Sequence, residues 1–246
     1  MYLMDDGIRL NAKLDMPTPA EGKHPLVIII HGFTGHMEEQ HLLAVSQARN
    51  GLGCATLRVD MYGHGASGGE FRNHTLYKWL TNALTVIDYA RSLDFATDIY
   101  LCGHSQGGLT VMLAGAMKRD VIRGLIVLSP AWMIPEAARN GTLLGEHFDP
   151  DHVPDELPAW GGRTLSGNYV RVAQMIRVEE AIDRYTGPVL IVHGDQDGAV
   201  PVEYGIRAAE RYQNAALALI PGDGHCYEYH LDQAVDAVIS WMRERV

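Results

Sequence analysis

The stretch Gly103-His104-Ser105-Gln106-Gly107 stands between an apolar run that ends at Cys102 and a segment with helical periodicity. It has the G-x-S-x-G pattern in the strand–turn–helix context that presents a nucleophilic serine. Such a turn is so sharp that the positions two before and two after the serine must be small. We therefore predict that Ser105 is a nucleophile on a strained turn, with its hydroxyl above the carboxyl edge of a sheet.

Short apolar runs rich in β-branched residues alternate with longer amphipathic stretches. The runs are typical of strands buried on both faces, and they cover residues 25–30, 54–59, 99–102, 125–128, 188–192 and 217–220. The helical stretches are residues 38–50, 76–92, 106–118, 203–212 and 231–245. This alternation predicts an α/β fold, a mostly parallel sheet with helices on both faces. Residues 8–14 alternate apolar and polar side chains, which predicts a strand at the edge of that sheet.

Residues 131–186 interrupt the alternation of apolar runs and amphipathic stretches. This part of the chain has no buried-strand run and is punctuated by prolines and glycines. A structureless loop of that length is unusual in a compact domain. We therefore predict an inserted lid subdomain at 131–186, placed on a core formed by residues 1–130 and 187–246.

A serine hydroxyl becomes a good nucleophile when a base takes its proton and an acid orients the base. In a G-x-S-x-G fold the acid and then the histidine follow the serine along the chain. Asp195 and Asp197 both follow the run 188–192. We favour Asp197, because Asp195 is nearer the strand end and better placed to order the turn. We favour His225 over His230 as the base, because His230 lies where the terminal helix begins.

The negative charge that develops during attack on a carbonyl needs hydrogen-bond donors aimed at it. The backbone N–H of Gln106, directly after the serine, is one candidate. The loop His31-Gly32-Phe33-Thr34-Gly35 follows the run 25–30, and its glycines allow close approach to a substrate. We therefore predict an oxyanion hole formed by the N–H groups of Phe33 and Gln106.

Composition excludes several other classes of protein. The formal net charge of −10 argues against a nucleic-acid partner, which needs a basic surface, and weakly against anionic lipid. We find no secretory signal and no apolar run long enough for a membrane span. The odd number of cysteines favours free thiols, so we expect a cytoplasmic protein. His36 and His41 lack the spacing of two ligands on one helix face, and no H-E-x-x-H motif is present, so we expect neither a metal nor a cofactor.

With these pieces placed, the chain closely resembles the bacterial feruloyl (cinnamoyl) esterases of the α/β-hydrolase superfamily. The resemblance rests on His31-Gly32-Phe33-Thr34-Gly35-His36, Asp60-Met61-Tyr62-Gly63-His64-Gly65, Gly103-His104-Ser105-Gln106-Gly107-Gly108, His193-Gly194-Asp195-Gln196-Asp197 and Pro221-Gly222-Asp223-Gly224-His225-Cys226. It implies hydrolysis of esters that link hydroxycinnamates to plant sugars. It also implies the triad Ser105, Asp197 and His225 and the oxyanion donors Phe33 and Gln106, together with a homodimer.

The resemblance further implies that the insertion builds the pocket for the aromatic acid. Its candidate substrate-binding residues are Trp132, Trp160 and Tyr169, with Tyr169 bonding a phenolic group and Trp160 stacking on the substrate or gating the pocket. The alternative is that these side chains form the insertion's own small core. Ala138 and Gly145 stand where some relatives carry polar side chains that contact the phenol.

We therefore predict a serine carboxylic-ester hydrolase that cleaves feruloyl-type esters through an acyl-enzyme on Ser105, with a small aromatic ester as its substrate. The nearest alternatives are a general short-acyl carboxylesterase and a monoacylglycerol lipase. An acyltransferase would use the same residues, and a non-catalytic binding module is the alternative from a different class.

Overall fold

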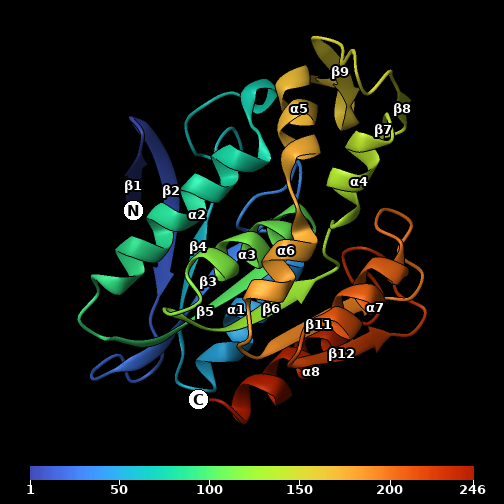
Figure 1. The fold of residues 1–246 in the computed structure, drawn as a ribbon. Helices are drawn as coiled ribbons and strands as arrows, with labels where there is room; N and C mark the ends of the chain where they lie inside the picture. Colours follow the sequence, from blue (N-terminus) through green and yellow to red (C-terminus); the bar gives the residue numbers. More distant parts are fainter.

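An eight-stranded sheet runs through the centre of the molecule (Figure 1). The structure, a computed structural model, describes residues 1–246 apart from the side chain of Asn50. In spatial order the strands are β1 (Tyr2–Asp5), β2 (Ile8–Asp15), β4 (Ala55–Val59), β3 (His24–Ile30), β5 (Ala96–His104), β6 (Ile122–Leu128), β11 (Val189–Gly194) and β12 (Ala215–Ile220). Only the pairings β1–β2 and β2–β4 are antiparallel among these strands. The predicted mostly parallel α/β-hydrolase sheet is confirmed.

The prediction that residues 8–14 form an edge strand is wrong. Strand β1 pairs with β2 on its outer side, with Leu3 opposite Leu10, so β2 is the second strand of the sheet. Leu10 is fully buried as a result. The carboxylate of Asp5 at the end of β1 accepts a hydrogen bond from the Asn82 side chain at 2.6 Å. The four residues of β1, Tyr-Leu-Met-Asp, do not alternate between apolar and polar side chains, so no strand pattern marks them in the sequence.

Helices cover both faces of the sheet. They are α1 (Gln40–Asn50) and α8 (Leu231–Arg243) on one face, and α2 (Leu76–Arg91), α3 (Gln106–Met117), α6 (Val178–Arg184) and α7 (Val202–Arg211) on the other. Strand side chains alternate between the two resulting cores: Val27 and Ile29 lie in one, and Leu26, Ile28 and Ile30 in the other. Helix α3 is buried along nearly its whole length, which is why its sequence is apolar on every side.

The residues between β6 and β11 first rise over the carboxyl ends of the strands, at the top of Figure 1, and then return to the level of the sheet. They form α4 (Met133–Arg139), β7 (Thr142–Leu143), β8 (Glu146–His147), β9 (Glu156–Ala159), η2 (Trp160–Gly162), β10 (Arg163–Ser166), α5 (Gly167–Met175) and finally α6. The strands pair as two small antiparallel hairpins, β7–β8 and β9–β10. Helix α6 packs against α3, and its Val178 and Ile182 belong to the main core. The division into a core and a lid subdomain stays a prediction.

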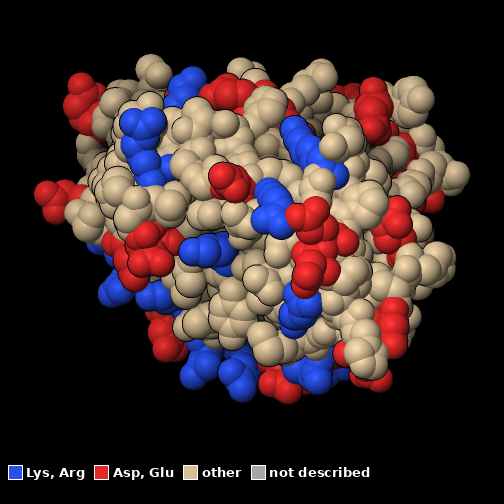
Figure 2. All heavy atoms as spheres, turned by 90° about the horizontal axis from the view of Figure 1, so that it is seen from above, with Lys and Arg blue, Asp and Glu red and all other residues tan. Residues whose placement is uncertain are grey.

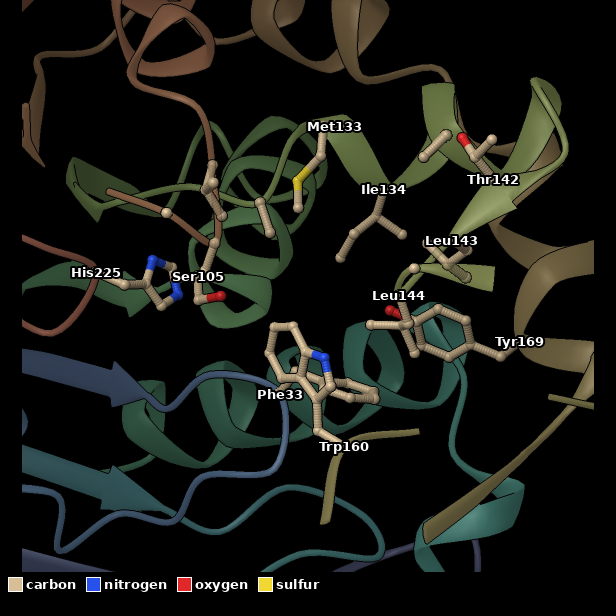
Figure 3. Close-up of a pocket in the computed structure, with 16 residues that line it drawn as sticks. Phe33, Ser105, Met133, Ile134, Thr142, Leu143, Leu144, Trp160, Tyr169 and His225 are labelled. Atoms are coloured by element: carbon tan, nitrogen blue, oxygen red, sulfur yellow. The ribbon is translucent and has the colours of Figure 1, made fainter. Parts of the chain in front are cut away.

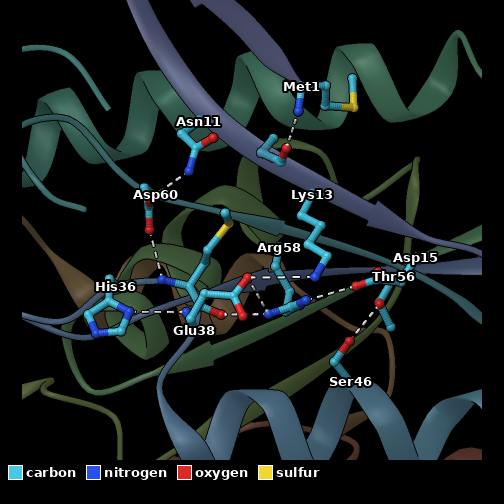
Figure 4. A network of polar contacts seen from close by, with 12 residues as sticks. Met1, Asn11, Lys13, Asp15, His36, Glu38, Ser46, Thr56, Arg58 and Asp60 are labelled. Carbon is cyan, nitrogen blue, oxygen red and sulfur yellow. Dashed lines mark hydrogen bonds and ion pairs between the residues drawn. The ribbon is translucent and has the colours of Figure 1, made fainter. Parts of the chain in front are cut away.

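A buried polar network holds the loops at the sheet's carboxyl edge (Figure 4). The Asp60 carboxylate, directly after β4, accepts hydrogen bonds from the backbone N–H groups of Met37 and Ala66 and from the Asn11 side chain, at 2.8 to 2.9 Å. The Arg58 guanidinium donates to the Met37 carbonyl and to an Asp15 carboxylate oxygen. The segment that leads from β3 into α1 is therefore fixed from two sides.

Acidic and basic side chains are interspersed over the face seen from above in Figure 2, with uncharged surface between them. Within the part of the chain that the structure describes, no helix is both long and apolar enough to cross a membrane.

Candidate active site

Ser105 stands alone between the end of β5 and the start of α3, with φ 55° and ψ −119°. A Cβ atom at Gly103 would lie 2.2 Å from the Gly107 carbonyl oxygen, and one at Gly107 would lie 2.4 Å from the Ile30 carbonyl oxygen. Both contacts are far too short for any side chain, so Gly103 is required by the turn itself and Gly107 by the packing of the turn against the end of β3. A non-glycine residue in such a backbone region costs about 1–3 kcal/mol, which the surrounding packing must offset.

His225 and Asp197 meet beside this turn. The Nδ1 atom of His225 donates a hydrogen bond to Asp197 Oδ2 at 2.7 Å. Figure 3 shows the imidazole next to the Ser105 side chain, whose hydroxyl points into a cavity. Because Nδ1 carries the proton that Asp197 accepts, Nε2 of His225 presents its lone pair. The structure thus brings together the three residues of the predicted triad.

The Asp197 side chain is fully buried, and both of its oxygens are bonded. Oδ1 accepts from the backbone N–H groups of Ala199 and Val200 at 2.8 Å, and Oδ2 lies 3.2 Å from His193 Nε2 as well as bonding His225. Burial opposes ionisation, but the hydrogen bonds from His193 and His225 outweigh it and hold the pKa of Asp197 well below its ordinary value. Asp197 is therefore an anion that fixes the orientation of His225.

Two other carboxylates shape the loop that carries His225, and sequence reasoning gave neither of them this role. The fully buried Asp223 accepts from the backbone N–H groups of Gly224, Tyr229 and His230. Asp195 accepts from Gly222 N–H at 2.7 Å, so it orders this loop rather than its own turn. An aspartate between two glycines, as at Asp223, is a common loop signal, but its partners follow from the fold.

The loop after β3 lies directly against Ser105. A Cβ atom at Gly32 would lie 3.0 Å from Ser105 Cβ, so a larger residue would push this loop away from the nucleophile. The backbone N–H groups of Phe33 and Gln106 donate no hydrogen bond to any residue that the structure describes. Free donors on both sides of a nucleophile are what an oxyanion hole requires, and the assignment of Phe33 and Gln106 to it stays a prediction.

Three buried histidines support this loop from behind. His31 donates from Nδ1 to the Gly32 carbonyl at 2.7 Å and accepts at Nε2 from Met61 N–H at 3.0 Å, so its ring is neutral. Its ring centroid lies 5.3 Å from that of His64, which in turn lies 4.9 Å from that of His74. Burial lowers the pKa of His31 and His74 to about 3 and that of His64 to about 4, and the neighbouring rings add to the effect for His31 and His74.

Because these three histidines are buried and neutral, we predict that the stability of the folded protein decreases in acid. Between pH 6.5 and 4 the unfolded chain binds protons on His31, His64 and His74 while the folded protein does not, so stability present at neutral pH is lost as the pH falls. Each histidine lowers the free energy of unfolding by up to about 1.4 kcal/mol per unit decrease in pH over this range. We expect the Tm to fall by at least about 5 °C between pH 7 and pH 5, measured by calorimetry. The His74→Asn variant keeps a donor near the position of Nδ1 and should show a shallower fall; equal Tm values at pH 7 and 5 would contradict this.

A cavity of about 430 Å³ opens from Ser105 and His225 into the insertion (Figure 3). Its lining comprises Phe33, Ser105, Ala131, Met133, Ile134, Ala137, Thr142, Leu143, Leu144, Gly145, Trp160, Tyr169, Gly198, Ala199, Val200 and His225. Most of these residues are apolar, and Thr142 lies at the end away from His225. The volume and character are those of a small-molecule site.

The three aromatic residues predicted to bind substrate differ in position. Trp160 and Tyr169 line the cavity, whereas Trp132 is not among its lining residues and is buried with its ring beside Tyr204. The Tyr169 hydroxyl donates to Gln106 Oε1 at 2.6 Å, and burial raises the pKa of Tyr169 well above its ordinary value. Tyr169 therefore positions the residue after the nucleophile, while half of the Trp160 side chain remains exposed.

This sheet, with a serine on a strained turn and a histidine–aspartate pair beside it, defines a serine hydrolase of the α/β-hydrolase fold. The model of the family described as serine aminopeptidase S33 matches residues 22–154, and the chain belongs to this family.

Similar proteins of known structure or sequence match most or all of this chain. Est1E from Butyrivibrio proteoclasticus, in a structure with ferulic acid bound, is 62% identical with a TM-score of 0.98, over 100% of this chain and 98% of that one. Human protein ABHD12B is 26% identical over 78% of this chain, which spans only 51% of that protein's length. The monoacylglycerol lipase of Mycolicibacterium smegmatis is 26% identical over 93% of this chain and 91% of its own length.

Proposed function

We propose that this protein hydrolyses esters of hydroxycinnamic acids, with Ser105 as nucleophile, His225 as general base and Asp197 as the acid that orients it. The observation that carries the proposal is the apolar cavity of about 430 Å³ that starts at Ser105 and is lined by Trp160 and Tyr169. A planar aromatic acyl group matches such a lining, and the 62% identical Est1E binds ferulic acid.

The proposed reaction has two halves. Ser105 Oγ attacks the ester carbonyl while His225 Nε2 takes the hydroxyl proton, and the N–H groups of Phe33 and Gln106 bond the oxyanion. The protonated His225 then donates to the leaving alcohol, which leaves the acyl group on Ser105. A water molecule repeats the attack with the same base, releasing the free acid and restoring the serine.

An aminopeptidase activity, the one in the family's description, finds less support. Such an enzyme holds the positively charged α-amino group of its substrate, for which a carboxylate is the natural partner. Among the described residues that line the cavity there is no aspartate or glutamate. The lining thus favours an uncharged acyl group.

The test is a comparison of kcat/KM for methyl ferulate, p-nitrophenyl butyrate and a monoacylglycerol. We expect methyl ferulate to be turned over with the highest kcat/KM. A higher value for the butyrate or the monoacylglycerol would overturn the hydroxycinnamate proposal in favour of a short-acyl carboxylesterase or a lipase. Addition of an alcohol acceptor distinguishes hydrolysis, which yields the free acid, from acyl transfer.

Thr142 is proposed to recognise the phenolic group. Among the hydroxyl and imidazole side chains that line the cavity, Ser105 and His225 lie at the reacting end and the Tyr169 hydroxyl already donates to Gln106. Thr142 lies at the other end, in β7 (Figure 3).

We expect Thr142→Val to reduce kcat/KM for methyl 4-hydroxycinnamate about 3- to 10-fold relative to methyl cinnamate, because it removes one neutral hydrogen bond. Thr164→Val, in the other hairpin and outside the cavity lining, is the matched control and should leave this ratio unchanged. A ratio that is the same in both variants would show that Thr142 does not contact the phenol.

We also propose that the enzyme works in the reducing cytoplasm as a homodimer. The cysteines Cys54, Cys102 and Cys226 are free thiols, two of them buried, which supports a reducing compartment. The dimer rests on the family resemblance, and light scattering of the purified protein tests it.

A further inference from the structure

A second cluster of chemically reactive side chains lies behind the catalytic histidine. Glu39 immediately precedes α1, His41 is in the first turn of that helix, and His104 directly precedes Ser105. One ligand atom from each residue lies within 4.8 Å of the other two. None of the three has a role in the proposed hydrolysis, and their separation in the chain hides the cluster from motif analysis.

Each of the three side chains has a polar atom without a hydrogen-bond partner. Glu39 Oε2, His41 Nε2 and His104 Nδ1 are buried and have no hydrogen-bond partner in the described part of the chain. The histidine residues are only 4% and 3% exposed, respectively. A buried polar atom without a partner costs about 1–3 kcal/mol, so three in one place need an explanation.

The tautomer of His104 determines what its unpartnered nitrogen can bind. Its Nε2 atom lies 2.9 Å from the carbonyl oxygen of His225 and must carry a proton to bond it, which leaves a lone pair on Nδ1. A Glu39 carboxylate oxygen is likewise an acceptor, and His41 Nε2 presents a lone pair when its proton is on Nδ1. In the tautomer with the His41 proton on Nδ1, all three atoms are acceptors and one cation satisfies them together, whereas a water molecule has only two O–H groups.

We propose that Glu39, His41 and His104 form a binding site for one transition-metal dication of the Zn²⁺ type. Two imidazoles and one carboxylate are ligands that Zn²⁺ prefers, and a solvent molecule can complete the tetrahedron. Bonds of about 2.0–2.1 Å place tetrahedral ligand atoms roughly 3.3–3.5 Å apart. The half-buried Glu39 and the His41 ring therefore rotate inward on binding, while the bond to His225 holds His104.

The backbone leaves room for these ligands. A Cβ atom at Gly35 would lie 2.3 Å from Glu39 Oε2, and one at Gly32 would lie 3.1 Å from His104 Nδ1. Side chains at these two positions would displace the ligand atoms. The loop that is proposed to form the oxyanion hole thus also borders the metal site.

Metal binding should inhibit hydrolysis, because the site adjoins the catalytic base. The ring centroids of His41 and His104 are 4.3 Å apart, and those of His104 and His225 are 4.6 Å apart. A dication at this place opposes the positive charge that develops on His225 when Ser105 attacks. This consequence rests on the proposed function, whereas binding of the metal does not.

Binding is measured without any ester. The full chain is freed of metal with a chelator, and Zn²⁺ affinity is determined by competition with a chromophoric chelator, with the visible absorption of bound Co²⁺ reporting tetrahedral coordination. We expect one equivalent to bind. His41→Gln and Glu39→Gln should each weaken binding by at least about 10- to 100-fold. His152→Gln removes an exposed histidine paired with Asp149 and should leave the affinity unchanged.

Inhibition is then measured for each variant relative to its own activity in chelator. We expect Zn²⁺ to inhibit the wild type and His152→Gln, and far higher concentrations to be needed for Glu39→Gln. Equal Zn²⁺ affinity in the wild type, His41→Gln and Glu39→Gln would overturn the proposed site. It would also be overturned if the wild type bound no stoichiometric Zn²⁺, and ordered water would then be the occupant. Glu39→Gln, a change of the half-buried ligand, carries the test if His41→Gln does not fold.

Discussion

Replacement of Ser105 by alanine is expected to lower kcat for ester hydrolysis about 10⁶-fold, to the level left by binding and the oxyanion donors alone. Without this hydroxyl, His225 has no proton to take, and no acyl-enzyme can form. The measurement is the initial rate with methyl ferulate, together with covalent labelling by a fluorophosphonate followed by mass spectrometry. The wild type should be labelled at Ser105 and the variant should not react.

Ser92→Ala is the matched control. Ser92 caps the end of α2, where its exposed hydroxyl donates to the Tyr89 carbonyl, and its replacement should leave turnover unchanged. Substantial turnover by the Ser105→Ala protein would mean that another nucleophile performs the reaction. Labelling of a different serine in the wild type would lead to the same conclusion.

Replacement of Asp197 by asparagine is expected to lower kcat about 10⁴-fold while the fold persists. The asparagine oxygen can still accept the N–H groups of Ala199 and Val200, which now bond Oδ1. Its amide NH₂ then faces His225 Nδ1, where the carboxylate accepted a proton. His225 must present a lone pair at Nδ1 and carry its proton on Nε2, the tautomer that cannot take a proton from Ser105.

Asp195→Asn makes the same chemical change two residues away. The one backbone hydrogen bond that the Asp195 carboxylate accepts near the site comes from the N–H group of Gly222. An asparagine side-chain oxygen can accept the same hydrogen bond. We expect this variant to lose less than about tenfold in kcat, since one neutral hydrogen bond replaces one to a charged group. If the two variants lost activity equally, the assignment of Asp197 as the orienting acid would fail.

The central strands and their helices could be predicted from local sequence because burial requires recognisable patterns of apolar residues. Parallel strands covered on both faces are continuous apolar runs, and β3 to β6 and β11 lie where such runs occur. Strand β12 is also an apolar run, but it lies at the edge of the sheet with Leu217 and Leu219 exposed, so the expectation of burial on both faces is wrong there. The boundaries differ by a few residues, as at β5, which extends from Ala96 to His104. The placement of β2 was wrong because its outer neighbour, Tyr2–Asp5, has no alternating pattern.

The candidate triad could be predicted because chain order and strand ends restrict it. Ser105, Asp197 and His225 each follow a strand whose carboxyl end lies at one edge of the sheet, so their sequence positions imply spatial proximity. No comparable rule restricts where the side chains of the insertion lie. Trp132, Trp160 and Tyr169 have similar sequence environments, yet two line the cavity and one packs beside Tyr204.

The sequence by itself determined the strained serine turn, because the steric exclusion at Gly103, where a Cβ would meet the Gly107 carbonyl, acts over a few residues and demands glycine. Only the tertiary structure decided which side chains stand behind that turn. Glu39, His41 and His104 come from two segments far apart in the chain, and Asp223 holds the His225 loop through backbone groups that any residue would offer. Contacts of this kind depend on how separate strands and helices are packed, which spacing along the chain does not encode.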